Sequence, residues 1–238
     1  MASSTSPDNI VYPDASDPIA PLNAVFQDLA ESVQEALDTI VPGAESLPDL
    51  SDVTITTPAD GQLLAYNGTN WVNEAPAVPA GSVLQVVSTT LTSGYTESIA
   101  SGAVSSAVVP GLTASITPTA TSNKIFVSVV IHASGEDAPS SVFSLLYRDS
   151  TAIAITNALG SRARMSAGAR VSDNNATVGL STQFLDEPST TSPLVYGVRF
   201  AHSNSSTSLI KINRANSDVG SFSDARYVST ITLMEVAG

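Results

Sequence analysis

The stretch LPDLSDVTITTPADGQLLAYNGTNWVNEAPA, residues 47–77, contains three short apolar runs separated by turn residues. Strands are predicted at 53–55, 63–66 and 71–73. Pro58–Gly61 is predicted to turn the first strand into the second. Asn67–Asn70 is predicted to turn the second strand into the third, because Asn and Gly both tolerate positive φ.

A module this small cannot cover its own apolar side chains. Leu63, Leu64, Tyr66 and Trp71 would be exposed in a single copy, and a lone hairpin is barely stable in water. The simplest cover is another copy of the same segment. We therefore expect a small interwoven β-module within a homotrimer, with Trp71 buried at the trimer interface.

The segment before this module has the features of a helix that runs from Asp17 or Pro18 to Val41. Asp17 can cap the helix, and Pro18 suits its first position, where the missing N–H costs nothing. Pro21 offers an equally good start. Pro42–Gly43 ends the helix.

Apolar residues of this helix recur at alternating intervals of four and three, which is a heptad stripe. They are Leu22, Phe26, Leu29, Val33, Ala36 and Ile40. An amphipathic helix that lies on its own domain shows a similar pattern over so few turns. A parallel three-stranded coiled coil is favoured because the long β region begins far downstream and because Val25, Ala30 and Leu37 widen the stripe.

From Val83 onward, short runs rich in Val, Ile and Thr alternate with Gly, Pro, Asn and Ser clusters, a pattern typical of an all-β domain. The predicted strands are 83–91, 95–100, 104–109, 113–117, 124–133, 141–148, 151–156, 162–171, 176–185, 194–202, 207–213 and 227–236. Their number and spacing favour a β-sandwich of jelly-roll type. Val127, Val129 and Ile131 alternate with their neighbours, which predicts a strand with one fully buried face.

Three parts are therefore predicted in a mainly β, homotrimeric protein. Residues 1–43 form an attachment segment and a trimerising coiled-coil helix, and the first 17 of them are extended until they bind a partner. Residues 44–82 form the short β-module and a semi-rigid Pro/Ala linker. Residues 83–238 form a jelly-roll-like β-sandwich head.

Charge divides the chain at Lys124. Residues 1–123 hold thirteen of the 22 acidic residues and none of the nine Lys and Arg, so the net charge of −13 lies there. Nucleic-acid binding needs clustered basic residues, and none is expected. The acidic part either keeps the protein soluble or docks on a basic surface of a partner.

The composition also limits location and chemistry. The chain has no Cys, which removes disulfides, Cys-bearing zinc sites and thiol catalysis. No apolar run approaches the roughly 18 residues of a membrane span, and the N-terminus lacks the pattern of a signal peptide. We therefore expect synthesis in a cytoplasm and no membrane insertion.

Residues suited to catalysis are scattered. His132 and His202 lie in strand-like runs without the partners of a triad or a metal site, so both are expected to be structural. Asp186–Glu187 and Glu136–Asp137 could supply paired carboxylates for glycoside cleavage, but both pairs lie at turns and the chain has few aromatic residues for a sugar cleft. We expect no enzyme, no cofactor and no metal. Asp173–Asn175 fits an Asx turn better than a calcium site.

Three arginines lie close together in the run GSRARMSAGAR, namely Arg162, Arg164 and Arg170. Arg162 and Arg164 share a face if this run is a strand. The three either pair with acidic residues of a neighbouring subunit or contact an anionic ligand, such as a cell-wall phosphate polymer or an acidic glycan. Loops are the other candidates for host contact, at Gly135–Ser140, Asp173–Ala176 and Ser217–Asp224.

Residues 50–73 resemble a module of bacteriophage tail-fibre and virion-fibre proteins, of the form L-x-D-V-x-I-x-x-P-x-x-G-Q-x-L-x-Y-N-G-x-x-W-V-N. Residues 7–38 are similar to the N-terminal attachment segments of some phage fibres and minor tail proteins. The C-terminal part resembles a domain shared by many phage fibres, through GLTASITPTATSNKIFVSV, LLYRDSTAI, FLDEP with LVYGVRF, and IKINRA with YVSTITLMEVA. In that family the domain is a trimeric jelly roll of the tumour-necrosis-factor kind at the outer tip.

This resemblance implies a structural virion fibre protein, made in the host cytoplasm and carried on the virion. The first interpretation is a tail fibre or receptor-binding protein whose N-terminal segment binds other virion proteins and whose head contacts host-surface polysaccharide. A capsid-mounted head fibre or decoration protein has the same build. A polysaccharide depolymerase is the third interpretation.

Overall fold

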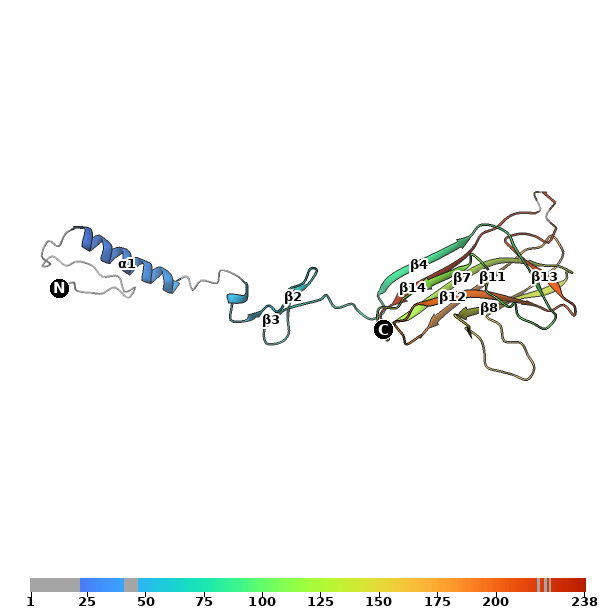
Figure 1. Cartoon of the computed structure of the whole chain (residues 1–238), viewed down its shortest axis with the longest axis horizontal. Helices are drawn as coiled ribbons and strands as arrows, with labels where there is room; N and C mark the ends of the chain where they lie inside the picture. The colour runs from blue at the N-terminus through green and yellow to red at the C-terminus, as the bar shows by residue number, and fades with distance from the viewer. Residues whose placement is uncertain (1–21, 41–46, 218, 221, 223) are drawn as a thin grey trace. The chain divides into compact units, whose positions relative to one another are not determined.

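The computed structural model describes residues 22–40, 47–217, 219, 220, 222 and 224–238. The chain divides into two compact units, Met1–Ala77 and Val78–Gly238. Figure 1 shows the helix and the small sheet of the first unit, and the large β-sandwich of the second. The two units are described separately.

The described part of the first unit contains one α-helix, α1 (Leu22–Ile40). The predicted starts at Asp17, Pro18 or Pro21 and the end at Pro42–Gly43 lie outside the described residues, as do the side chains of Leu22 and Ile40. Within α1, the side chains of the predicted stripe remain open to solvent in a single copy: Phe26 is 59% exposed and Leu29 and Val33 are each 40% exposed. The helix is thus present, while its assembly into a coiled coil stays a prediction.

The predicted β-module is a three-stranded sheet that follows a short 3-10 helix, η1 (Leu47–Asp49). Its strands are β1 (Val53–Thr54), β2 (Leu63–Tyr66) and β3 (Trp71–Glu74). The strand order β1-β3-β2 places β3 in the centre, with β1 parallel and β2 antiparallel to it. The predicted turn between the first two strands is present, and in it the Gln62 N–H donates to the Ala59 carbonyl (3.3 Å). The turn belongs to a crossover, residues 55–62, that runs from one edge of the sheet to the other.

Asn side chains explain this arrangement. Asn73 on β3 accepts a hydrogen bond from the Thr56 amide (2.8 Å) and donates to the Thr56 carbonyl (2.9 Å) and to Gln62 (2.6 Å), which ties the crossover to the central strand. Between β2 and β3, the Asn67 side chain accepts from the amides of Thr69 and Asn70. Gly68 takes a φ of +99° in this turn, a conformation that suits glycine.

The second unit consists of strands joined by turns and loops (Figure 1). Its strands are β4 (Val83–Leu91), β5 (Tyr95–Ile99), β6 (Thr113–Ile116), β7 (Lys124–Gly135), β8 (Ser140–Arg148), β9 (Thr151–Ile153), β10 (Ala167–Val171), β11 (Val178–Asp186), β12 (Leu194–His202), β13 (Ser208–Ile212) and β14 (Ser229–Val236). One sheet has the order β10-β8-β12-β6, with β9 beside β8. The other has the order β4-β14-β7-β13-β5, with β11 on the opposite side of β7.

The antiparallel pairs of this unit are nested in the chain. The strand β4 pairs with β14, β6 with β12, β7 with β11, and β8 with β10. A chain that pairs its outermost strands, then the next ones inward, forms a long hairpin rolled over on itself, which is how a jelly roll is built. The expected β-sandwich is thus confirmed.

The core lies between the two sheets. Along β7 the side chains of Val127, Val129 and Ile131 are buried, while Ser128 and Val130 face outward, as the alternation in the sequence predicted. Ile231 and Leu233 of β14 and Phe200 of β12 are buried in the same cluster. Each large apolar side chain buried in this way stabilises the fold by about 1.5–3 kcal/mol.

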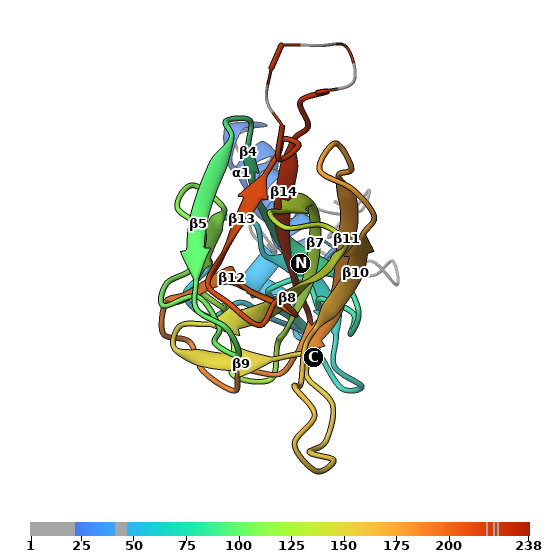
Figure 2. The same ribbon diagram turned by 90° about the vertical axis from the view of Figure 1, so that its right-hand side faces the viewer.

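Three predicted strands differ in the structure. Residues 104–109 form no strand, because the Ser105 hydroxyl, instead of a backbone carbonyl, accepts the Phe200 N–H (3.0 Å) and interrupts the ladder. Residues 154–166 form a projecting segment (Figure 2), so that β9 is short and β10 begins only at Ala167. Ala154 has a positive φ of 54°, and the Ser166 hydroxyl accepts the Leu146 N–H (2.9 Å) in place of a backbone group.

Glu235 of β14 is a fully buried carboxylate that holds the loop before β7. One oxygen accepts hydrogen bonds from the amide and hydroxyl of Thr119 (2.6 and 2.8 Å) and from Asn123 (2.6 Å), and the other accepts from Gln85 (2.6 Å). Burial alone would raise the pKa of Glu235, but these donors outweigh it and the pKa is lowered.

Replacing Glu235 by Gln is expected to lower the free energy of unfolding at pH 7 by about 2 kcal/mol, since the four hydrogen-bond donors around it lose a charged acceptor. The lowered pKa makes the ionised carboxylate stabilising above the ordinary glutamate value of about 4.3, and this contribution is lost as the pH falls through the folded-state pKa. Denaturant unfolding between pH 7 and pH 3 measures both effects. The wild type should lose more stability than Glu235→Gln on acidification, whereas parallel pH profiles would contradict this role. Glu136→Gln is the control.

Candidate functional site

The most distinctive surface of the described residues lies on the outer face of the β10-β8-β12-β6 sheet, beside the 154–166 segment. One hollow of about 450 Å³ lies on the β12 side of this segment, and another of about 510 Å³ lies on the β10 side. Phe143, Ala163 and Met165 line both, so the two hollows adjoin. We call them together the arginine groove. They are within the size range of ligand sites, about 300–1,000 Å³.

All three arginines singled out in the sequence line this groove. Arg162 and Arg164 belong to the projecting segment and line the first hollow, and Arg170 on β10 lines the second. The expectation that Arg162 and Arg164 share a strand face was wrong, because residues 162–166 are not part of a strand. The groove nevertheless brings the three residues to one region of the surface.

Aromatic residues of β8 form the floor. Phe143 lies against the backbone of Gly168, where an added Cβ would stand 2.5 Å from the Phe143 ring. Tyr147 lines the first hollow, and the guanidinium of Arg199 lies 4.2 Å from the centre of its ring, a cation–π contact. The groove therefore has an apolar floor with cations around it.

Arg199 adds a feature that the sequence did not reveal. Its Nε is buried and has no hydrogen-bond partner among the described residues, and the same holds for Oε2 of Glu97. Burial raises the pKa of Glu97, against the opposing effects of the Ser105 hydroxyl and the Arg199 charge. The two residues are separated by about a hundred positions in the chain, so no local pattern could have linked them.

Both histidines have backbone partners. Nε2 of His202 donates to the Ile99 carbonyl (2.8 Å), and its Nδ1 accepts from the Asn204 amide (3.1 Å). Nδ1 of His132 donates to the Val228 carbonyl (2.9 Å), and its ring stacks on Tyr227 with 4.9 Å between the ring centres. These contacts agree with the structural role expected for both.

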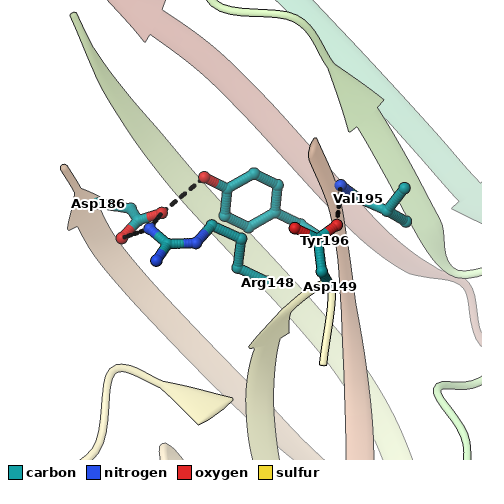
Figure 3. A network of polar contacts seen from close by, with 5 residues as sticks. All are labelled: Arg148, Asp149, Asp186, Val195 and Tyr196. Carbon is teal, nitrogen blue, oxygen red and sulfur yellow. Dashed lines mark hydrogen bonds and ion pairs between the residues drawn. The ribbon is translucent and has the colours of Figure 1, made fainter. Parts of the chain in front are cut away.

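Asp186 takes part in a buried network that joins the two sheets (Figure 3). Its carboxylate accepts two hydrogen bonds from Arg148 (2.9 and 2.8 Å) and one from the Tyr196 hydroxyl (2.6 Å). Burial and the neighbouring carboxylate raise the pKa of Tyr196. Asp149 accepts the Val195 N–H (2.9 Å) beside this network. Asp186 thus links β11 in one sheet to β8 and β12 in the other.

The remaining acidic candidates are dispersed. Glu187 forms an exposed ion pair with Lys124 (2.7 Å), and Glu136 and Asp137 lie in the β7–β8 turn, where Asp137 has a φ of 57°. Asp173 accepts the Asn175 N–H (2.8 Å), which is the predicted Asx turn. Among the described residues, no three His, Asp or Glu side chains are grouped as a metal site would require. No described helix is long and apolar enough to cross a bilayer.

The strands that carry the three predicted tip loops have the ends concerned at one end of the sandwich, where Ser140 pairs with Val171 and Ala133 pairs with Val178 and Ile212. The Ser217 amide donates to the Asn174 carbonyl (3.2 Å), and the Asn204 side chain donates to the Glu136 carbonyl (3.2 Å). The β10–β11 and β13–β14 loops are therefore in direct contact. Val83, where β4 begins, pairs with Val236 at the opposite end of the sheet.

The outer face of the other sheet is free of charge over three cross-strand rows. Each row crosses β4, β14, β7 and β11 in that order. The first row consists of Val86, Met234, Phe126 and Leu185, the second of Ser88, Thr232, Ser128 and Gln183, and the third of Thr90, Thr230, Val130 and Ser181. Several of the apolar side chains are open to solvent, with Val86 56% and Leu185 45% exposed. We call this surface the uncharged face.

The fold and the site define a β-sandwich protein with a small N-terminal β-module. No protein-family model matches the chain, and no curated protein matches it. Solved structures that share similarity include the infectious bursal disease virus Gt strain (12% identity, TM-score 0.34, 74% of this chain and 42% of that chain) and Gx strain (15%, 0.31, 74% and 46%). A third is the VP2 subviral particle of the same virus (13%, 0.32, 76% and 46%). This chain spans less than half the length of those chains, and similarity this low assigns no function.

Replacing Asp186 by Asn is expected to lower the free energy of unfolding by about 3 kcal/mol, because Arg148 then keeps a partly buried charge without its counter-ion. Tyr196→Phe removes one hydrogen bond to a charged group and should cost about 1.5–3 kcal/mol. Glu187→Gln, which removes only an exposed ion pair, is the control and should cost less than about 1 kcal/mol. Equal unfolding midpoints for Asp186→Asn and the control would show that the network does not hold the sheets together.

Proposed function

We propose that this protein is a structural virion fibre protein of a tailed bacteriophage. It acts as a homotrimeric tail fibre or receptor-binding protein without enzymatic activity. The N-terminal segment binds other virion proteins, and the β-sandwich is the head that contacts host-surface polysaccharide. Several weak sites on each trimer give avidity, so no deep pocket is needed.

The observation that carries this proposal is the set of apolar side chains left open in the first unit. Phe26, Leu29 and Val33 are exposed on α1, and Trp71 is 42% exposed on the central strand of the small sheet, where it contacts only Tyr66 among aromatic rings of the described residues. Apolar side chains at heptad spacing are covered by partner helices in coiled coils. The helix α1 and the small sheet that follows it therefore both leave apolar surface for further copies of the chain to cover.

The uncharged face of the second unit supports the same assembly. Interfaces between subunits are depleted of charge at their centre, and this face combines exposed Val and Leu with Ser and Thr. Its occupant is a further copy of this chain. Copies that are joined through α1 bring their heads to a high effective concentration, so even a modest contact between these faces forms.

A capsid-mounted head fibre or decoration protein is the second candidate, because the same trimer can be attached to the shell. A depolymerase is disfavoured by the separate roles of the acidic residues. Asp186 is held in a network between the sheets, and Glu187 pairs with Lys124. Neither pair of adjacent carboxylates lines the arginine groove.

The full-length chain is expected to sediment at three times its mass of 24.4 kDa. Phe26→Ser combined with Val33→Ser removes apolar side chains from the stripe, so the concentration at half-dissociation should rise at least tenfold. Glu31→Ser, outside the stripe, should leave it unchanged. Analytical ultracentrifugation over a concentration series measures all three proteins. A wild-type monomer at micromolar concentration would rule out the trimer.

Trp71, the single tryptophan of the chain, reports directly on assembly. Burial between copies should shift its fluorescence emission to the blue in the native assembly. The emission should shift to the red in the Phe26→Ser, Val33→Ser variant on dissociation. Emission like that of free tryptophan in the assembled wild type would contradict an interwoven module.

Two experiments, one on intact virions and one on phage adsorption to host cells, test the function itself. Antibody labelling of intact virions should place the chain on the tail, and labelling of the shell would favour the capsid-mounted alternative. Purified full-length protein should also compete with phage adsorption to host cells. A folded trimer that neither binds cells nor reduces adsorption would overturn the receptor-binding role.

A further inference from the structure

The arginine groove combines positive charge with an absence of negative charge. Arg162, Arg164 and Arg170 line its two hollows, and no Asp or Glu is among the described residues that line either of them. The second unit as a whole is nearly charge-balanced, since residues 124–238 hold nine acidic and nine basic residues. The clustering of arginines in the groove is therefore not explained by an excess of basic residues in the second unit.

The three arginine side chains are also available to bind a ligand. Within the described part of the chain, none of their guanidinium groups forms an ion pair or a hydrogen bond. By contrast, Arg148 is used in the Asp186 network and Arg199 covers the Tyr147 ring. An arginine fork matches carboxylate and phosphate groups with two parallel hydrogen bonds, so these side chains are available for an anion.

The aromatic floor of the groove also limits which kind of ligand fits it. Phe143 is shared by both hollows, and Tyr147 lies in the first beside Ala152, Ile155 and Ala201. Sites for small ligands combine apolar and aromatic linings with a few polar groups that fix orientation. An aromatic floor flanked by forked cations suits ring-shaped units that have an apolar C–H face and carry acidic substituents.

The shape of the groove indicates a polymer. Its hollows of about 450 and 510 Å³ adjoin at Phe143, Ala163 and Met165, with two arginines at the first and one at the second. A ligand with several negative charges spaced along its length could contact Arg162 and Arg164 in the first hollow and Arg170 in the second. Repeating acidic units have such spaced charges.

We propose that the arginine groove binds an anionic polysaccharide, with Arg162 and Arg164 holding one acidic group and Arg170 the next. Carboxylate-bearing and phosphate-bearing polymers share the required chemistry. This inference rests on the proposed function, because it names the ligand class that the fibre head contacts. It replaces pairing between subunits as the role of these arginines.

Binding is tested with the full-length protein and defined probes, by calorimetry at low ionic strength. Polygalacturonate represents a carboxylate polymer, inorganic polyphosphate a phosphate polymer, and dextran a neutral polysaccharide. Binding is expected to one or both anionic probes and not to dextran, and the preferred probe distinguishes carboxylate from phosphate. Arg162→Gln with Arg164→Gln should weaken that binding by roughly tenfold or more, and adding Arg170→Gln should weaken it further.

Lys124→Gln is the matched control, because it removes a positive charge on a different surface, where Lys124 pairs with Glu187. An equal loss of binding in this control would contradict the groove, since it would reveal non-specific attraction. Absence of binding to both anionic probes, equal binding to dextran, or tighter binding to duplex DNA would contradict it as well. Circular dichroism and the sedimented mass establish that each variant is folded and assembled.

Competition with phage adsorption tests the role of the groove separately from the proposed function. If the wild type competes with phage adsorption and the triple arginine variant competes equally well, the groove is not the binding site, while the fibre role stands. If the triple variant loses competition and the Lys124→Gln control retains it, the groove is supported in its biological setting. If the wild type itself does not compete, the proposed receptor-binding role fails.

Discussion

Apolar surface that one copy of the chain leaves uncovered is the constraint on which the organisation of this protein depends. The second unit closes its own core between two sheets, with Val127, Ile131 and Leu233 almost completely buried. The described part of the first unit has no comparable core, and Phe26 and Trp71 face solvent. Burying a large apolar side chain contributes about 1.5–3 kcal/mol, so a few such residues from each copy would stabilise the proposed assembly.

The two sheets of the head have different outer surfaces. One outer face is crossed by rows without charge, from β4 through β14 and β7 to β11. The other is overhung by the 154–166 segment and lined by three arginines. We propose a division of labour in which the uncharged face contacts further copies and the arginine groove remains open to a ligand. The Asp186–Arg148–Tyr196 network links the sheets that carry these two surfaces.

Much of the fold could be predicted from the sequence because its signals are local. The alternation of Val127, Val129 and Ile131 identifies a strand and its buried face without knowledge of its partners, and the turn at Asn67–Gly68 depends on adjacent residues. The parallel pairing of β1 with β3 was missed, because strand order depends on contacts between Asn73 and Thr56, seventeen positions apart. The strand expected at 104–109 does not form, because the Ser105 hydroxyl takes the place of a backbone carbonyl as the acceptor of the Phe200 N–H. The arginines were found as a cluster in sequence, whereas the floor beneath them comes from β8 and could not be inferred.

Electron cryomicroscopy of the purified full-length protein tests the central claim most directly, because it shows which surfaces the copies use to cover one another. The expected result is a threefold assembly in which Phe26, Val33 and Trp71 are buried between chains, the uncharged face is turned towards the neighbouring copies, and the arginine groove is open to solvent. A single chain in solution, or an assembly in which the arginine groove is buried and the uncharged face is open, would contradict this account.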